Sequence, residues 1–87
     1  MHAVLITVTI NDQSAARGQL DGLVPQVSGM PGFVAGSWVA LSQDKGTAMI
    51  VLDSEESAQS LVPVAQSAPP GAVTTQSIEV GEVMAHA

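Results

Sequence analysis

Two apolar segments joined by a short polar turn, with the start of a helix directly after them, constrain the fold of this chain more than any other feature. The segments Phe33–Leu41 and Thr47–Leu52 are rich in strand-favouring residues, and the polar residues 43–46 between them are typical of a turn. Ser54 then stands where a helix N-cap is expected, and two glutamates follow it in the first helical turn. This stretch therefore predicts a β-hairpin that leads directly into a helix.

A strand and a helix are predicted before this hairpin. The segment His2–Ile10 is rich in Val, Ile and Thr, which is typical of a strand. Apolar residues at helical spacing predict a helix over residues 12–27, and Asn11 is expected to cap it. The hairpin is therefore expected to pack in a sheet with an earlier strand.

The last predicted strand, Val73–Val83, completes the order strand, helix, strand, strand, helix, strand. Its alternation places Gln76, Ile78 and Val80 on one face. Two strand–helix–strand units in this order predict a ferredoxin-like α+β fold, in which a four-stranded antiparallel sheet carries both helices on one face. We expect residues 1–87 to form one such domain.

The sheet in this fold has a second face that no helix covers. The predicted strands place leucine, valine and alanine on it, together with either Trp38 or Phe33. A domain as small as this one buries only about 60% of its unfolded surface, so a lone monomer would be marginally stable. Two sheets packed face to face would bury both apolar faces, and we therefore predict a homodimer.

The charge balance excludes several classes of partner. The chain has 2 Lys and Arg against 8 Asp and Glu, a formal net charge of −6, which leaves too few cations for a nucleic acid or an anionic membrane surface. The apolar run Ala3–Ile10 is too short to span a bilayer and follows no basic segment, so we expect a cytoplasmic protein. The absence of cysteine excludes disulfides and thiolate chemistry.

Three short motifs mark the borders of the predicted elements. They are Met30-Pro31-Gly32-Phe33 before the second strand, Asp44-Lys45-Gly46 in the turn, and Ile50–Ala58 where the third strand meets the second helix. With these motifs the chain resembles, over nearly its whole length, the antibiotic-biosynthesis-monooxygenase-like domains of the dimeric α+β barrel superfamily. The resemblance implies the ferredoxin-like fold and a homodimer. Members of this family include cofactor-independent oxygenases of polycyclic phenols, haem-degrading enzymes and proteins without known activity.

The sequence departs from this family at positions that matter for chemistry. Leu52 stands where many members have a tryptophan before the acidic start of the second helix, and this helix lacks the histidine of the haem-degrading members. The chain also has no tyrosine. We therefore assign no catalytic residue, no cofactor and no metal, and we leave open whether the chain is an enzyme.

Trp38, Asn11 and Phe33 are the candidate residues for a ligand pocket. Trp38 is the only tryptophan and suits the wall of a pocket for a flat apolar molecule, although a buried tryptophan is more often part of a core or an interface. Asn11 corresponds in the resemblance to a family asparagine near the first strand, but helix capping explains it without chemistry. We predict a homodimeric protein without catalysis that binds a small apolar ligand or only self-associates. The alternative is a cofactor-independent monooxygenase of an aromatic, polycyclic small molecule, and a subunit that binds a partner through an open sheet edge is a third possibility.

Two further polar features have both a functional and a plain interpretation. His2 and His86 are expected to meet near Glu82 if the first and last strands pair, which would make a metal site or a pH-sensitive pair; however, chain ends fray and a firm third ligand is missing. Arg17, the only arginine, would hold an anionic ligand or pair with Asp21 four residues on; a salt bridge or a solvated side chain is the more common outcome.

Overall fold

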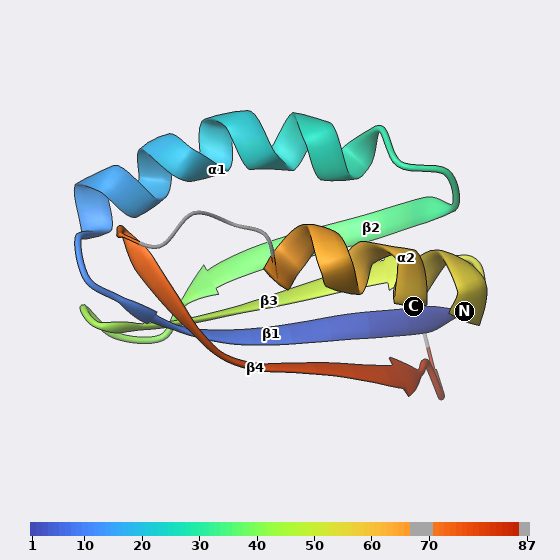
Figure 1. Ribbon diagram of the computed structural model, residues 1–87. Helices are drawn as coiled ribbons and strands as arrows, with labels where there is room; N and C mark the ends of the chain where they lie inside the picture. Colours follow the sequence, from blue (N-terminus) through green and yellow to red (C-terminus); the bar gives the residue numbers. More distant parts are fainter. Residues whose placement is uncertain (67–70, 86–87) are drawn as a thin grey trace.

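A computed structural model describes residues 1–66 and 71–85 and contains the predicted order of elements. The elements are β1 (His2–Ile10), α1 (Gln13–Ser28), β2 (Phe33–Ala40), β3 (Lys45–Leu52), α2 (Glu55–Gln66) and β4 (Val73–Glu82). The four strands form one antiparallel sheet in the order β2-β3-β1-β4, and both helices lie on the same side of it (Figure 1). The predicted ferredoxin-like α+β fold is confirmed.

The register of the sheet decides which side chains face the helices. Val4 of β1 lies opposite Ile50 of β3 and Val80 of β4, and these residues belong to the hydrophobic core beneath the helices. The next residue, Leu5, lies opposite Met49 and points to the other face of the sheet. Successive residues of β1 therefore face the helices and the opposite side of the sheet in turn.

The pairing of β1 with β4 contains a bulge midway along the two strands. The register shifts there by one residue and leaves Gln76 as the extra residue of β4, whose Nε2 donates to Oγ1 of Thr9 at 2.9 Å on the face away from the helices. Beyond the bulge, Thr75 and Val73 turn toward the helices. The prediction that Gln76 shares a face with Ile78 is wrong, because an inserted residue reverses the alternation of a strand.

The start of α1 differs from the prediction by one residue. Asp12, and not Asn11, is the N-cap: its backbone is extended and its side chain accepts a hydrogen bond from the Ala15 N–H at 3.1 Å. The Asn11 N–H is bonded to the carbonyl oxygen of Ala72 at 2.8 Å, so Asn11 still belongs to the pairing of β1 with the segment before β4. A tertiary contact thus moves the cap, since both residue types cap helices well.

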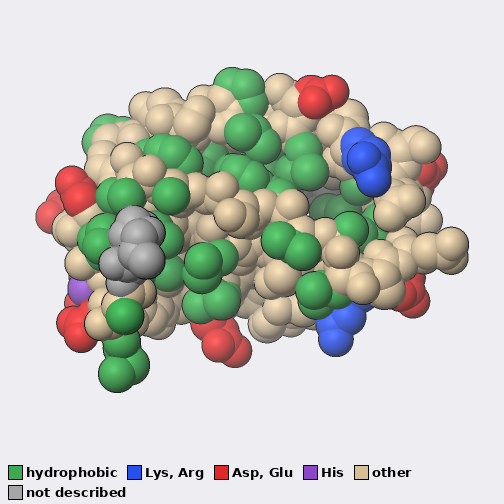
Figure 2. Space-filling view, turned by 180° about the vertical axis from the view of Figure 1, so that it is seen from behind, with side chains coloured by type: hydrophobic (Ala, Val, Ile, Leu, Met, Phe, Trp, Pro, Cys, Tyr) green, Lys and Arg blue, Asp and Glu red, His purple; other side chains and the backbone are tan. Residues whose placement is uncertain are grey.

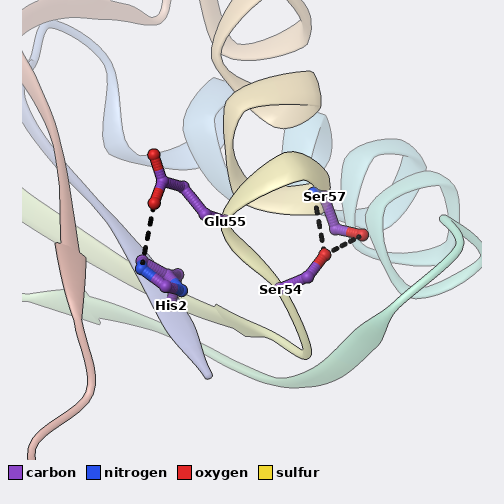
Figure 3. A network of polar contacts seen from close by, with 4 residues as sticks. All are labelled: His2, Ser54, Glu55 and Ser57. Atoms are coloured by element: carbon purple, nitrogen blue, oxygen red, sulfur yellow. Dashed lines mark hydrogen bonds and ion pairs between the residues drawn. The ribbon is translucent and has the colours of Figure 1, made fainter.

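The start of α2 agrees with the prediction. The Ser57 N–H donates to Oγ of Ser54 at 3.2 Å, which is the expected N-cap hydrogen bond (Figure 3). Glu55 and Glu56 occupy the first turn, where the helix dipole favours negative charge. Among the described residues, no helix is long and apolar enough to cross a membrane.

Gly32 joins the loop after α1 to the start of α2. Its φ is +85°, a conformation that side chains rarely adopt, and a Cβ here would collide with the Asp53 carboxylate and the Ser57 hydroxyl. The Gly32 carbonyl also accepts a hydrogen bond from the Asp53 N–H at 2.8 Å. Only glycine therefore allows β2 to begin this close to the strand–helix junction.

The core is concentrated under α2 and under the C-terminal end of α1. Its fully buried members come from both helices and from the two central strands: Val4, Val27, Ile50, Leu52, Ala58 and Leu61. Of these, α1 supplies only Val27 although it is 16 residues long. Most of α1 therefore covers the sheet without filling the space beneath it.

Candidate functional site

A cavity of about 610 Å³ lies between α1, α2 and the helix-facing side of the sheet. Its walls are mostly apolar. Seen from behind, hydrophobic side chains gather in a hollow across the middle of the molecule, with a Lys or Arg side chain close by (Figure 2). The larger apolar residues that line the cavity are Ile6, Val8, Ile10, Leu20, Leu23, Trp38, Ile50, Leu61, Val64 and Val73.

Small residues on the sheet help to explain why this space exists. In the register of the sheet, Ala40 of β2 lies opposite Gly46 of β3, and Trp38 lies opposite Ala48. Ala40, Gly46 and Ala48 all line the cavity. Because they present little or no side chain to α1, the space between this part of the sheet and the helix is not filled.

Trp38 forms part of the cavity wall and lies across Gly36. A Cβ on Gly36 would come within 2.9 Å of Cη2 and 3.0 Å of Cζ3 of the Trp38 ring. The glycine therefore provides the room in which the indole lies along β2. No described residue accepts a hydrogen bond from the indole N–H, which leaves one donor free beside an apolar cavity.

The polar part of the lining comes mainly from α1. Gln13 and Arg17, four residues apart, lie on one side of the helix, and Gln19 and Gln26 lie on the other. Arg17 is the only charged residue among the described residues that line the cavity. Its guanidinium is exposed and forms no ion pair with Asp21 or with any other described residue.

The three residues predicted to form the pocket lie in different places. Trp38 lines the cavity, whereas Asn11 and Phe33 are not among the described lining residues. The Asn11 amide donates to the Gly71 carbonyl oxygen and to Oγ1 of Thr74, each at 3.0 Å, and so holds the end of β1 to β4. Phe33 packs against the core. A ligand contact at any of the three stays a prediction.

His2 lies beside the start of α2. Its Nε2 is 3.6 Å from Oε2 of Glu55, and its Nδ1 is buried without a hydrogen-bond partner among the described residues (Figure 3). Glu82 lies opposite His2 in the sheet register, while His86 falls outside the described residues. Within residues 1–66 and 71–85, no three His, Cys, Asp or Glu side chains are grouped closely enough to hold a metal ion.

Leu20 and Leu23 of α1 belong to the part of the site that sequence reasoning missed. Leu20 and Leu23 have the spacing of an ordinary core stripe, and they line the cavity. The signal that would have revealed them lies on the opposite wall, where Ala40, Gly46 and Ala48 are too small to fill the space under a helix. Small residues on one layer facing leucines on the other indicate a gap.

Comparison with known proteins finds the same fold. No family model and no curated protein matches the chain, whereas several solved structures do. SnoaB, a cofactor-independent oxygenase from Streptomyces nogalater, superposes with a TM-score of 0.68 at 11% identity, over 98% of this chain and 94% of the other. The structure of a SnoaB point mutant gives a TM-score of 0.68 at 12% identity, over 98% of this chain and 95% of that one.

A second protein with a different activity has a similar structure. MhuD from Mycobacterium tuberculosis, a heme-degrader solved with two hemes bound in its active site, gives a TM-score of 0.56 at 18% identity, over 97% of this chain and 98% of that one. The chain has the fold of these proteins. The resemblance noted in the sequence is thus confirmed at the level of the fold, and at these identities the likeness shows the fold alone.

Proposed function

We propose that this protein binds a small, flat, apolar molecule in the cavity between α1 and the sheet. The cavity itself carries the proposal, because about 610 Å³ is in the usual range for small-molecule sites. Such sites combine mainly apolar walls with a few polar groups, as this one does. A ligand of two or three fused rings would lie against Trp38, Leu20 and Leu23 and remove their apolar surface from water, which contributes about 25 cal/mol per Å².

The test uses N-phenyl-1-naphthylamine, a neutral fluorescent molecule with an apolar ring system. Trp38 is the only tryptophan and the chain has no tyrosine, so energy transfer to a bound dye has a single donor. Because transfer reaches across a domain of 33 × 22 × 20 Å, it reports binding to the protein, and the cavity variants locate the dye. Ala16→Phe fills the cavity, because Ala16 lines it. Ala15→Phe is the matched control, because Ala15 is exposed on the same helix and is not a described lining residue.

We expect the wild-type protein and Ala15→Phe to bind the dye equally well, with transfer from Trp38, and Ala16→Phe to bind it at least tenfold more weakly. Circular dichroism would first establish that both variants fold. Equal binding by the two folded variants would place the dye elsewhere, and the ligand cavity would then have to be abandoned.

Cofactor-independent monooxygenation of an aromatic, polycyclic molecule in the same cavity is the second candidate. The fold shared with SnoaB and the size of the cavity favour it. The described lining residues supply no carboxylate or imidazole as a general base, so a substrate would have to ionise without one. Oxygen uptake with an anthrone, measured for the wild-type protein and for Ala16→Phe, tests this activity. Rates equal to the uncatalysed rate would dispose of it.

We also propose that two copies of the chain pair through the sheet face away from the helices. Leu5, Val39 and Met49 lie on this face and remain 41%, 47% and 48% exposed. Contiguous exposed apolar residues of this kind mark interaction surfaces, and a second identical face is complementary in polarity. A location in the cytoplasm and the absence of nucleic-acid partners stay predictions from composition.

A further inference from the structure

We infer that the ligand of this cavity carries one anionic group, which Arg17 binds at the edge of the apolar walls. The inference rests on the proposed ligand-binding function and narrows the ligand to one chemical class. That class is a flat, mainly apolar molecule with a single carboxylate, sulfonate or phenolate.

The first support is the unpaired state of Arg17. The chain has 8 Asp and Glu residues for only 2 Lys and Arg, so an arginine has many potential partners. Arg17 nevertheless forms no ion pair or hydrogen bond from its side chain to any described residue, and it lines the cavity. A guanidinium presents several donors in a rigid fork, which matches the two oxygens of a carboxylate.

The second support is the placement of the charge. Gln13 precedes Arg17 by one helical turn, lines the same cavity and makes no hydrogen bond from its side chain to a described residue. Leu20 follows Arg17 on the same side of α1 and belongs to the apolar wall. On this side of α1, two side chains with unused hydrogen-bond donors are followed by apolar residues. A molecule with one polar end could bind its polar group to the donors and place its rings against the apolar residues.

The third support is the lack of competing negative charge. Among the described residues that line the cavity there is no Asp or Glu, although the protein as a whole has a net charge of −6. Arg17 therefore supplies the only charge among the described lining residues, although Asp21 follows it by one turn on the same helix. A cationic ligand of the same shape would meet Arg17 as a like charge and bind less well.

Two dyes with the same ring skeleton test the inference. Anilinonaphthalene sulfonate carries a sulfonate, whereas N-phenyl-1-naphthylamine lacks it. Arg17→Gln removes the charge, and Arg17→Lys keeps the charge but not the fork. Because hydrogen bonds to charged groups contribute about 1.5–3 kcal/mol, Arg17→Gln should weaken sulfonate binding by about tenfold or more. Binding of the neutral dye should change by less than about twofold, and Arg17→Lys should be intermediate.

The dependence of sulfonate binding on ionic strength tests the contact with Arg17 independently. Sulfonate binding to the wild-type protein should weaken as ionic strength rises, and this dependence should be lost in Arg17→Gln. If Arg17→Gln changes the affinity for both dyes equally, or for neither, the inference fails while the cavity proposal stands. If neither dye binds to the wild-type protein, or if Ala16→Phe leaves both affinities unchanged, the cavity proposal fails and the inference fails with it.

Discussion

Replacing Gly32 with alanine should destabilise this protein strongly. Gly32 has a φ of +85°, where an alanine costs about 1–2 kcal/mol because its Cβ crowds the following carbonyl. The added Cβ would also collide with the Asp53 carboxylate and lie 3.0 Å from Cβ of Ser57. Displacing these groups adds about 1–3 kcal/mol, the usual cost of overpacking. We therefore expect Gly32→Ala to lower the free energy of unfolding by about 2–5 kcal/mol.

The same substitution at Gly18 should have the opposite sign. Gly18 lies inside α1, and a Cβ there would meet no atom within 4 Å. Alanine favours a helix over glycine by about 1 kcal/mol, so Gly18→Ala should raise the free energy of unfolding by roughly that amount. Both variants replace a glycine hydrogen with a methyl group. Opposite changes in stability would therefore come from the backbone conformation and surroundings of each glycine, and not from alanine itself.

Denaturant unfolding followed by circular dichroism measures both effects. A domain of 87 residues has a free energy of unfolding of about 4–13 kcal/mol. A loss of about 2–5 kcal/mol is a large fraction of this total, so Gly32→Ala should clearly lower the denaturant concentration at the unfolding midpoint. It should also lower the melting temperature by about 8 °C or more. A loss below about 1 kcal/mol for Gly32→Ala, or destabilisation by Gly18→Ala, would refute the reasoning.

Four further substitutions test the cavity, the dimer and the second helix. Gly36→Ala should displace the Trp38 ring, so we expect weaker binding of the neutral dye. The free energy of unfolding should change by less than about 1 kcal/mol, because the higher strand propensity of alanine offsets part of the strain on the displaced ring. Leu5→Glu should convert a dimer into a monomer at micromolar concentration, as measured by light scattering; a wild-type monomer would rule the dimer out. Ser54→Ala should cost about 1 kcal/mol through loss of the N-cap, whereas Ser60→Ala, which removes a hydrogen bond within the helix, should be nearly neutral.

The sequence is sufficient for the elements whose signals are local. It predicts the bounds of β1 as observed, and Ser54 caps α2 because its hydroxyl reaches a donor three residues away. The cap of α1 is predicted one residue too early. Asn11 and Asp12 are equally good caps in isolation, and the hydrogen bonds of Asn11 to the distant segment 71–74 take it out of the capping role.

The candidate site is predictable only in part. Trp38 stands out in the sequence because it is unique, and it lies in the cavity wall. The role of Leu20 could not be read from the chain, because a leucine over a cavity and a leucine in a core have the same helical spacing. Arg17 stands out as the only arginine, but whether it pairs with Asp21 depends on rotamers and neighbours that spacing alone does not determine.

The bulge between β1 and β4 has a consequence for how relatives of this chain should be compared. With regular pairing, Gln76 and Thr74 would turn inward and give the cavity amide and hydroxyl groups; with the bulge, Thr75 and Val73 occupy those positions. The gain or loss of one residue in this half of β4 would therefore change which of its side chains face the cavity, without any amino-acid substitution. An alignment that scores only amino-acid identity would miss such a change, because it alters which residues of β4 line the cavity and not which residues are present.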